Sequence, residues 1–320
     1  MPGLAEVRAA ADRIRRYVVR TPLERSARLS EQCQRDVWLK LECFQRTGSF
    51  KLRGALNAVL LLSQDERKHG VVTASAGNHG LGVARAAAQT GVAATVVVPE
   101  TASMAKIAAL RGSGAELLLR GSTYDDAEAA ARQLSRERQL VYVSAYNDPA
   151  VVAGGGTIAL EILEDLPSAR TLIVPAGGGG LIGGVGIAAH GLDPEITIYG
   201  VQSEASPALH AAHQAGRRVE VEVKDSLADG LAGNVEEGSI TFDLLRQHVR
   251  AVAVVTEQAI ADAMRWLLRE EHVLVEGSAA VGVAAFQTGA LQASANGPVV
   301  LVLTGRNVAA SVLQQYVFDS

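Results

Sequence analysis

The sequence has few of the features that mark secreted or membrane-spanning proteins. Its 320 residues include only two cysteines, Cys33 and Cys43, and these form no CxxC pair. Such sparse usage fits free thiols in a reducing compartment. No apolar run reaches the length that spans a bilayer, and the N-terminal residues lack the apolar core of a signal peptide. We therefore predict a soluble, cytoplasmic protein with no membrane partner.

Positive charge and aromatic side chains are also scarce. The formal net charge is -4, and only 4% of residues are aromatic. Nucleic-acid binding needs basic surfaces and often stacking rings, so the composition argues against a nucleic-acid partner. The chain is 48% hydrophobic and 20% charged. That mix is globular, and the length suffices for one large or two ordinary domains.

Short apolar segments alternate with helical patterns along most of the chain. The main predicted strands are 37–42, 71–74, 93–98, 116–119, 140–143, 171–175, 196–202, 252–255 and 299–303. Predicted helices include 5–16, 103–111, 122–138, 149–164, 256–271 and 278–287. Residues 217–250 look less regular and more charged. Strands that alternate with helices predict an α/β protein with largely parallel sheets.

Lys51 stands at the start of a predicted helix, between the apolar residues Phe50 and Leu52. The positive end of a helix and partial burial both disfavour a charged ammonium group. A lysine that spends time as a free amine is a nucleophile toward aldehydes. A solvated lysine in a first helical turn has the same local sequence, so a functional role needs support from other segments.

A run of four glycines, Gly177–Gly180, follows the predicted strand 171–175 and leads into a helix. Unshielded backbone N–H groups and the positive helix end suit a phosphate. Gly178, Gly180 and Gly183 also match the dinucleotide fingerprint, and Glu204 lies roughly 20 residues on, where an acidic ribose partner belongs. A nicotinamide-dependent oxidoreductase is therefore an open alternative, although it gives Lys51 no role.

Two more polar segments follow predicted strands. Residues 75–80, with the sequence Ser-Ala-Gly-Asn-His-Gly, form a strand-to-helix turn, and ligands collect at such turns in parallel sheets. Asn78 offers two donors and an acceptor there. Thr304 and Gly305 end the apolar strand near the C-terminus. The Thr304 hydroxyl can bond a ring nitrogen or cap a helix.

Together these segments resemble the fold-type II pyridoxal-phosphate enzymes, in the threonine dehydratase and serine racemase group. The motifs that carry the resemblance, in that group's order and spacing, are Ser49–Gly54, Ser75–His79, Gly177–Gly180 and Thr304-Gly305. The resemblance covers nearly the whole chain. It implies two open, mostly parallel sheets flanked by helices, with the cofactor between two domains. The larger domain would comprise residues 1–69 and 148–320, and the smaller inserted domain residues 70–147.

The resemblance also implies a role for each motif toward pyridoxal 5'-phosphate. Lys51 would bind the cofactor covalently and act as the catalytic base. The other cofactor-binding residues would be Phe50, Asn78, Gly177, Gly178, Gly179, Gly180, Gly230, Glu276 and Thr304. Asn78 would bond the ring hydroxyl and Thr304 the pyridine nitrogen. The substrate side would be lined by Ser75, Ala76, Gly77, Asn78 and His79.

The activity that the resemblance implies is β-elimination of a β-hydroxy amino acid such as L-threonine or L-serine. Ala76 stands where serine racemases have a serine, which favours a dehydratase over a racemase. Gln202, Ser206 and Ala208 occupy positions of the group's divalent-metal site. We therefore expect no metal, although Glu204 keeps the question open. A homodimer is expected from the group, and no C-terminal regulatory domain is expected.

Other functions remain compatible with the sequence. Within the group these are a dehydratase of a hydroxyectoine-derived substrate, a 3-hydroxyaspartate dehydratase and a serine racemase. Outside it they are a β-replacement enzyme of the cysteine synthase type, a cofactor-binding regulator without turnover and the oxidoreductase above. His210 and His213 have the spacing of zinc ligands on a helix, but no third ligand is evident.

Overall fold

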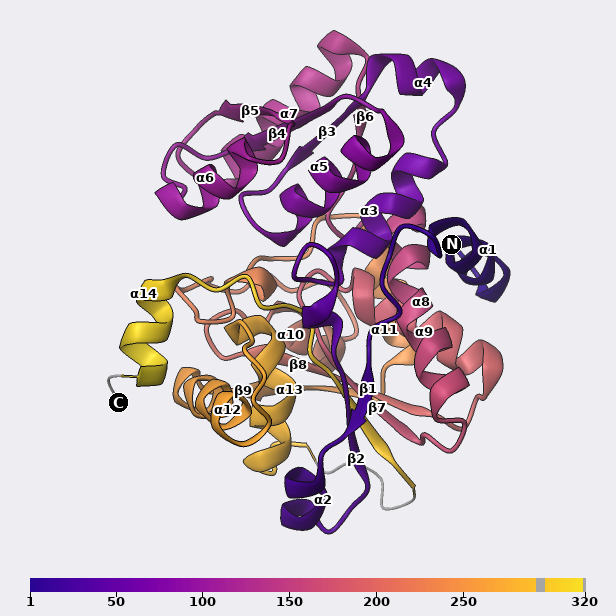
Figure 1. Cartoon of the computed structure of the whole chain (residues 1–320), viewed down its shortest axis with the longest axis vertical. Coiled ribbons are helices and arrows are strands. Elements are labelled where there is room, and N and C mark those ends of the chain that lie inside the picture. Colours follow the sequence, from indigo (N-terminus) through magenta and orange to yellow (C-terminus); the bar gives the residue numbers. More distant parts are fainter. Residues whose placement is uncertain (292–296, 319–320) are drawn as a thin grey trace.

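The computed structural model describes residues 1–291 and 297–318, and its strands form two separate sheets (Figure 1). The larger sheet has six strands in the order β1-β2-β10-β7-β8-β9. These strands are β1 (Leu23–Arg25), β2 (Val37–Lys40), β7 (Thr171–Pro175), β8 (Thr197–Ser203), β9 (Ala251–Val255) and β10 (Val299–Val302). Only the β1–β2 pair is antiparallel among the pairs of this sheet.

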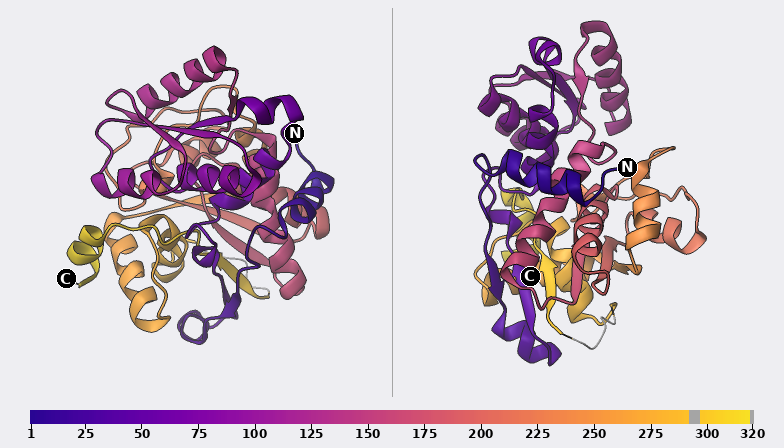
Figure 2. Two further views of the ribbon diagram at one scale, coloured as in Figure 1. Left: turned by 45° about the horizontal axis from the view of Figure 1, so that its top comes forward. Right: turned by 90° about the vertical axis from the view of Figure 1, so that its right-hand side faces the viewer.

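The smaller sheet has four parallel strands in the order β5-β4-β3-β6. They are β3 (Val71–Ala74), β4 (Ala94–Val98), β5 (Glu116–Leu119) and β6 (Val141–Tyr142), and the helices around them are α5 (Asn78–Thr90), α6 (Met104–Arg111) and α7 (Tyr124–Arg138). Figure 2 shows this sheet and its helices to one side of the six-stranded sheet. The predicted fold class is confirmed.

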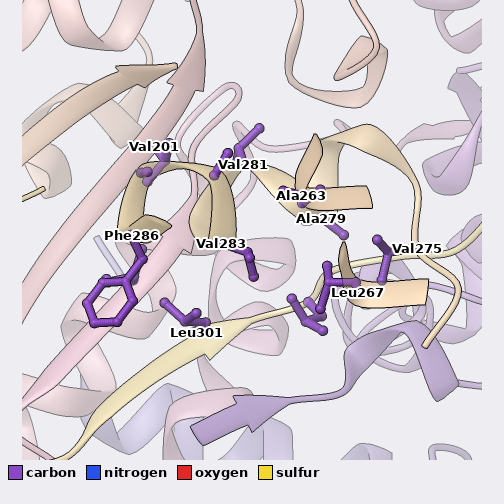
Figure 3. Close-up of a cluster of buried hydrophobic side chains, with 14 of the residues drawn as sticks. Val201, Ala263, Leu267, Val275, Ala279, Val281, Val283, Phe286 and Leu301 are labelled. Atoms are coloured by element: carbon purple, nitrogen blue, oxygen red, sulfur yellow. The ribbon is translucent and has the colours of Figure 1, made fainter. Parts of the chain in front are cut away.

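Helices cover both faces of the larger sheet, because its strands are apolar on both sides. The alternating residues of β10 show this: Val299 and Leu301 belong to one core cluster, and Val300 and Val302 to another. The helices that contribute to these clusters include α1 (Leu4–Ile14), α8 (Pro149–Asp165), α9 (Gly180–Leu192), α10 (Ala208–Ala215), α11 (Ile240–His248), α12 (Glu257–Glu270) and α13 (Gly277–Gln287). Figure 3 shows Leu301 beneath Phe286 and Val283 of α13.

Glycines allow the helices near Lys51 to approach one another closely. Helix α3 (Lys51–Leu60) packs between α5 and α8. A Cβ atom on Gly154 of α8 would lie 2.6 Å from the carbonyl oxygen of Arg53, and one on Gly156 would lie 2.5 Å from that of Gly184. The glycine run of α8 therefore permits backbone-to-backbone contact on two sides of the helix. It fixes α3 against α8, and α8 against α9.

Several short elements were not predicted. They are α2 (Ala27–Cys33), α4 (Gln64–His69), α14 (Ala310–Leu313), β1, and the helical turns η1 (Glu42–Phe44), η2 (Asp229–Leu231) and η3 (Gln314–Phe318). Segment 217–250, predicted to be irregular, contains α11, which begins after its N-cap Ser239. Helix α4 is highly charged and is held by a capping box of Ser63 and Glu66, a signal that hydrophobic periodicity does not detect.

Candidate active site

The turn before Lys51 is tied to the end of strand β10. The backbone N–H of Phe50 donates to the carbonyl oxygen of Thr304 at 3.0 Å, and Ser49 forms an isolated β-bridge with Gly305. Lys51 follows as the first residue of α3. The lysine motif and the Thr304 motif, more than 250 residues apart in sequence order, therefore lie side by side.

The side chain of Lys51 is half-buried, and its Nζ donates to the carbonyl oxygen of Ala145 at 2.8 Å. Burial lowers the pKa of Lys51 to about 8, and the nearby Glu276 carboxylate limits this decrease. The Phe50 ring centroid lies 5.3 Å from Nζ. With such a pKa, roughly a tenth of the amine is neutral at pH 7, so Lys51 can act as a nucleophile or a base.

Asn78 joins the two sheets through hydrogen bonds at both ends of its amide. It is the first residue of α5, directly after the loop that follows β3. Its Nδ2 donates to Oε1 of Glu276 at 2.7 Å, and its Oδ1 accepts from Nδ2 of Asn307 at 2.6 Å. The backbone N–H of Asn307 also donates to Oε2 of Glu276 at 3.1 Å. The predicted residues Asn78 and Glu276 are thus in contact, and Asn307, which no motif marked, completes the group.

Glu276 is a buried carboxyl group, with 6% of its surface exposed, at the N-cap of α13. Burial, reinforced by the charge of Asp229, raises the pKa of Glu276 to about 7, although the hydrogen bond from Asn78 opposes the increase. The group therefore changes protonation near neutral pH. Because Glu276 also acts on the charge of Lys51, the two groups are electrostatically coupled.

This titration predicts a pH dependence of stability for the protein without cofactor. The folded protein binds a proton at Glu276 between about pH 4.5 and pH 7, whereas the unfolded chain does not, so the free energy of unfolding falls as pH rises through this window. We expect Glu276→Gln to remove up to about 3 kcal/mol of this decrease. Urea titrations at pH 5 and pH 8 measure the free energy of unfolding of the wild type and the variant, with the exposed Glu237→Gln as control. If Glu276→Gln shows the same difference between the two pH values as the wild type, the prediction is contradicted.

The glycine loop lies at the carboxyl end of β7 and the N-terminus of α9. Its N–H groups are among those that a helix leaves without intrahelical partners. Gly179 has φ +89, in the left-handed region, and a Cβ there would lie 2.8 Å from Cβ of Thr241. The Thr241 hydroxyl donates to the carbonyl oxygen of Gly178 at 2.7 Å. The loop is therefore a fixed backbone cradle of the kind that binds phosphate.

Gly230 and Thr304 lie near the glycine loop and the Lys51 turn, respectively. The carbonyl oxygen of Gly230 would be 3.4 Å from a Cβ on Gly177, and its N–H donates to Oγ of Ser278 at 3.0 Å. Thr304 is buried, with 3% of its surface exposed. Gly230 thus lies beside the glycine loop, and Thr304 lies beside the turn before Lys51.

The loop of residues 75–79 borders open space at one position and is buried at another. A Cβ on Gly77 would meet no atom within 4 Å, and the Ser75 hydroxyl accepts from the Gly77 N–H at 3.2 Å. His79 is buried, and its Nε2 lies 3.1 Å from the carbonyl oxygen of Val143. Burial, with the charge of Lys51 as a second cause, lowers the pKa of His79 to about 3. His79 is therefore a neutral support beneath the loop.

The residues considered above as ribose or metal ligands form hydrogen bonds with other parts of the chain. Oε1 of Glu204 accepts from the N–H of Glu257 at the start of α12, and Oε1 of Gln202 accepts from the N–H of His210. The His210 ring contacts the carbonyl oxygen of Val252 in β9, and the His213 ring contacts that of Val249, two residues before β9. Across residues 1–291 and 297–318, no group of three or more His, Cys, Asp or Glu side chains could hold a metal ion. The same part of the chain contains no helix with the length and apolarity of a membrane span.

The fold and this site define the class of protein. Residues 14–305 match the family described as pyridoxal-phosphate dependent enzyme, and the chain belongs to that family. This membership supports the phosphate interpretation of the glycine loop over the nicotinamide one. The residues also fit the cofactor chemically, because a glycine cradle, a largely desolvated amine and an anchored amide occur together.

Individual relatives within this family are similar over most of the chain. The chain is 45% identical to an L-threonine ammonia-lyase of Thermotoga maritima over 285 residues, which cover 89% of this chain and 71% of that protein. It is 36% identical to a catabolic L-threonine dehydratase of Escherichia coli, covering 98% of this chain and 95% of that one. The structure of maize serine racemase superposes with a TM-score of 0.94 at 31% identity, covering 98% and 96% of the two chains.

Proposed function

We propose that the protein is an ammonia-lyase that converts a β-hydroxy amino acid, such as L-threonine or L-serine, into a 2-oxo acid and ammonia. The observation that carries this proposal is Lys51, a half-buried amine whose pKa is lowered to about 8 and whose Nζ lies beside the Ala145 carbonyl. Relatives named L-threonine ammonia-lyase and L-threonine dehydratase, at 45% and 36% identity, support the same reaction.

Pyridoxal 5'-phosphate would be held by groups from both sheets. Gly177–Gly180 would bind its phosphate, and Lys51 its aldehyde carbon. Asn78 would bond its ring hydroxyl, Thr304 its ring nitrogen, and Phe50 would pack beside the ring. When bound, the cofactor supplies an electron sink for the electron pair released at the substrate α-carbon.

Within that site, Lys51 removes the α-proton as a general base, because its lowered pKa leaves a usable fraction of free amine. The C–O bond at the β-carbon then breaks, and the hydroxyl leaves as water with the proton that Lys51 took from the α-carbon. The enamine product takes up water again and releases ammonia. Residues 75–79 would bind the substrate carboxylate, with Gly77 beside open space and His79 as a neutral support.

Ala76 favours elimination over racemisation. Racemisation requires a proton donor on the face of the substrate opposite Lys51, and a methyl side chain cannot supply one. The serine racemase alternative, which the structural similarity to the maize enzyme keeps in view, therefore needs a donor from elsewhere. We expect 2-oxo acid formation to exceed D-serine formation when L-serine is the substrate.

The test begins with the visible absorption spectrum of the purified protein with added pyridoxal phosphate. We expect a yellow band that borohydride bleaches and that Lys51→Ala lacks, because only a free amine at this site links to the aldehyde. Release of 2-oxo acid is then assayed with L-threonine, L-serine, 3-hydroxyaspartate and a hydroxyectoine-derived diamino acid. This panel separates the dehydratase alternatives.

Two outcomes overturn the proposal. A protein that stays colourless with excess pyridoxal phosphate has no such site. A yellow protein that releases no 2-oxo acid from any substrate is a binding protein or an enzyme of another reaction class. Lys68→Arg, at an exposed lysine of α4 paired with Asp65, serves as the control for nonspecific effects of lysine replacement.

We further propose that residues 70–147 form a separate domain, that the protein is a homodimer and that it is cytoplasmic. The location of all four strands of the smaller sheet within residues 71–142 supports the domain boundary. Light scattering of the purified protein tests the oligomeric state.

A further inference from the structure

The segment between β6 and α8 contacts both Lys51 and the glycine loop, although no motif marked it. It forms a compact turn in which Oγ of Ser144 accepts from the N–H of Asn147 at 3.1 Å. Asp148 then caps α8 through the N–H groups of Ala150 and Val151. The turn is thus held at both of its ends.

Tyr146, at the centre of this turn, lies directly against the glycine loop. A Cβ on Gly178 would lie 2.4–2.7 Å from atoms of the Tyr146 ring, and a Cβ on Gly180 would lie 2.9 Å from its Cα and carbonyl oxygen. Any side chain at these two positions would displace Tyr146. Two of the four glycines therefore have a steric reason to be glycine, beyond the exposure of their N–H groups.

The same turn positions the reacting amine. The residue before Tyr146 is Ala145, whose carbonyl oxygen accepts from Nζ of Lys51 at 2.8 Å. Consecutive residues of one turn thus contact the two groups that a single cofactor must reach, the lysine amine and the phosphate loop. The distance between the lysine amine and the phosphate loop therefore depends on the position of this turn.

Tyr146 is held at its far end as well. Its phenol oxygen accepts from the N–H of Glu236 at 3.2 Å, and the Glu236 carboxylate pairs with Arg132 of α7 at 3.0 Å. Burial raises the pKa of Tyr146 to about 12, so the phenol is neutral at physiological pH. Asn147 reaches the same region, because its Oδ1 accepts from the N–H of Ile240 at 3.1 Å.

We propose that Tyr146 is a positioning residue for cofactor binding, whose ring sets the backbone of Gly178–Gly180 at a fixed distance from Lys51. The inference rests on the proposed function, since it takes pyridoxal phosphate as the ligand of the loop. Tyr146 acts through the loop and the turn, and the ring, more than the hydroxyl, carries the effect.

The test measures pyridoxal phosphate affinity in place of turnover alone. The cofactor is removed from the holoenzyme and titrated back, and the dissociation constant is taken from the visible band. For Tyr146→Leu we expect an increase of about tenfold to a hundredfold, because a displaced loop no longer matches the span to Lys51. Tyr146→Phe keeps the ring and is expected to stay within about threefold of the wild type.

Tyr142 provides a matched control in the same cluster. Its hydroxyl donates to Oε1 of Glu128, and Arg132 lies over its ring at 4.4 Å. We expect Tyr142→Leu to lower the unfolding temperature without changing the dissociation constant for pyridoxal phosphate. Such a result separates a general loss of packing from loss of the contact with the glycine loop.

The outcomes distinguish this inference from the proposed function. If the wild-type protein gives no visible band, the proposed function fails, and the role of Tyr146 fails with it. If the wild type binds and Tyr146→Leu binds equally tightly, only the role of Tyr146 is overturned. Equal weakening in Tyr146→Leu and Tyr142→Leu also overturns it, because the effect is then not specific to the loop.

Discussion

Replacement of Lys51 by arginine is expected to lower the release of 2-oxo acid from L-threonine at least about a thousandfold. Arginine keeps a long stem and a positive charge but remains protonated at all accessible pH values. The variant therefore separates the need for a free amine from the need for a cation. Purified wild type and variant are compared by the initial rate at saturating substrate.

The lowered pKa of Lys51 adds a pH dependence that the arginine variant must lack. Only the neutral amine attacks an aldehyde, so the rate of pyridoxal phosphate uptake by the apoprotein should rise with pH and level off above about 8. The same shift makes the apoprotein more stable as pH rises from about 8 toward 10.5, because the unfolded chain then binds the additional proton. Both effects are expected to vanish in Lys51→Arg.

An arginine variant with activity within tenfold of the wild type would contradict the role of Lys51. The control is Lys68→Arg, which changes an exposed lysine paired with Asp65. It should retain full activity and the same pH profile. A loss in the control would point to a general effect of the substitution on folding.

The motifs that were found from the sequence share one property: their chemistry is local. Lys51 is recognisable from a turn, a helix start and two apolar neighbours, and Gly177–Gly180 from four consecutive residues. Each segment also sits at an element boundary that hydrophobic periodicity detects. Their convergence in space was expected only from the resemblance to a known family, and in the structure Asn78 donates to Glu276 across the two sheets.

The supporting residues could not be predicted in the same way. Asn307 bonds Asn78 and Glu276 from a distant part of the chain, and Ala145 contributes only a backbone carbonyl, which any residue type supplies. Tyr146 lies against Gly178 because β6 and α8 meet there. Such pairings depend on tertiary packing, for which a single sequence carries no spacing rule. Helix α11 was missed because segment 217–250 is charged and irregular up to its N-cap.

Arg53, two residues after Lys51, is expected to be the most costly ionic side chain to remove. We expect Arg53→Met to destabilise the protein by about 3–5 kcal/mol, since it leaves the buried Glu42 carboxylate without its cationic partner and Glu161 with Lys40 alone. For a protein of this size the unfolding temperature would fall by roughly 10 °C. Thermal unfolding followed by circular dichroism measures the change.

The reason is a charge network that is largely shielded from water. The guanidinium group is fully buried, with 0% of the residue exposed. It donates to both carboxylate oxygens of Glu42 at 2.8 Å and to those of Glu161 at 2.7 and 2.9 Å. Lys40 balances the second carboxylate at 2.6 Å. The bonds connect α3 with η1 and α8, so they also hold the helix that begins at Lys51.

Arg20 offers the comparison that isolates burial. It pairs with Glu164 and Asp165 as Arg53 pairs with its two carboxylates, but half of its side chain is exposed. Arg20→Met should therefore cost less than about 1 kcal/mol. Neutralising the opposite charge should also recover part of the loss, so Arg53→Met combined with Glu42→Gln should be more stable than Arg53→Met. If the two arginine variants lose equal stability, burial of the network does not determine its contribution.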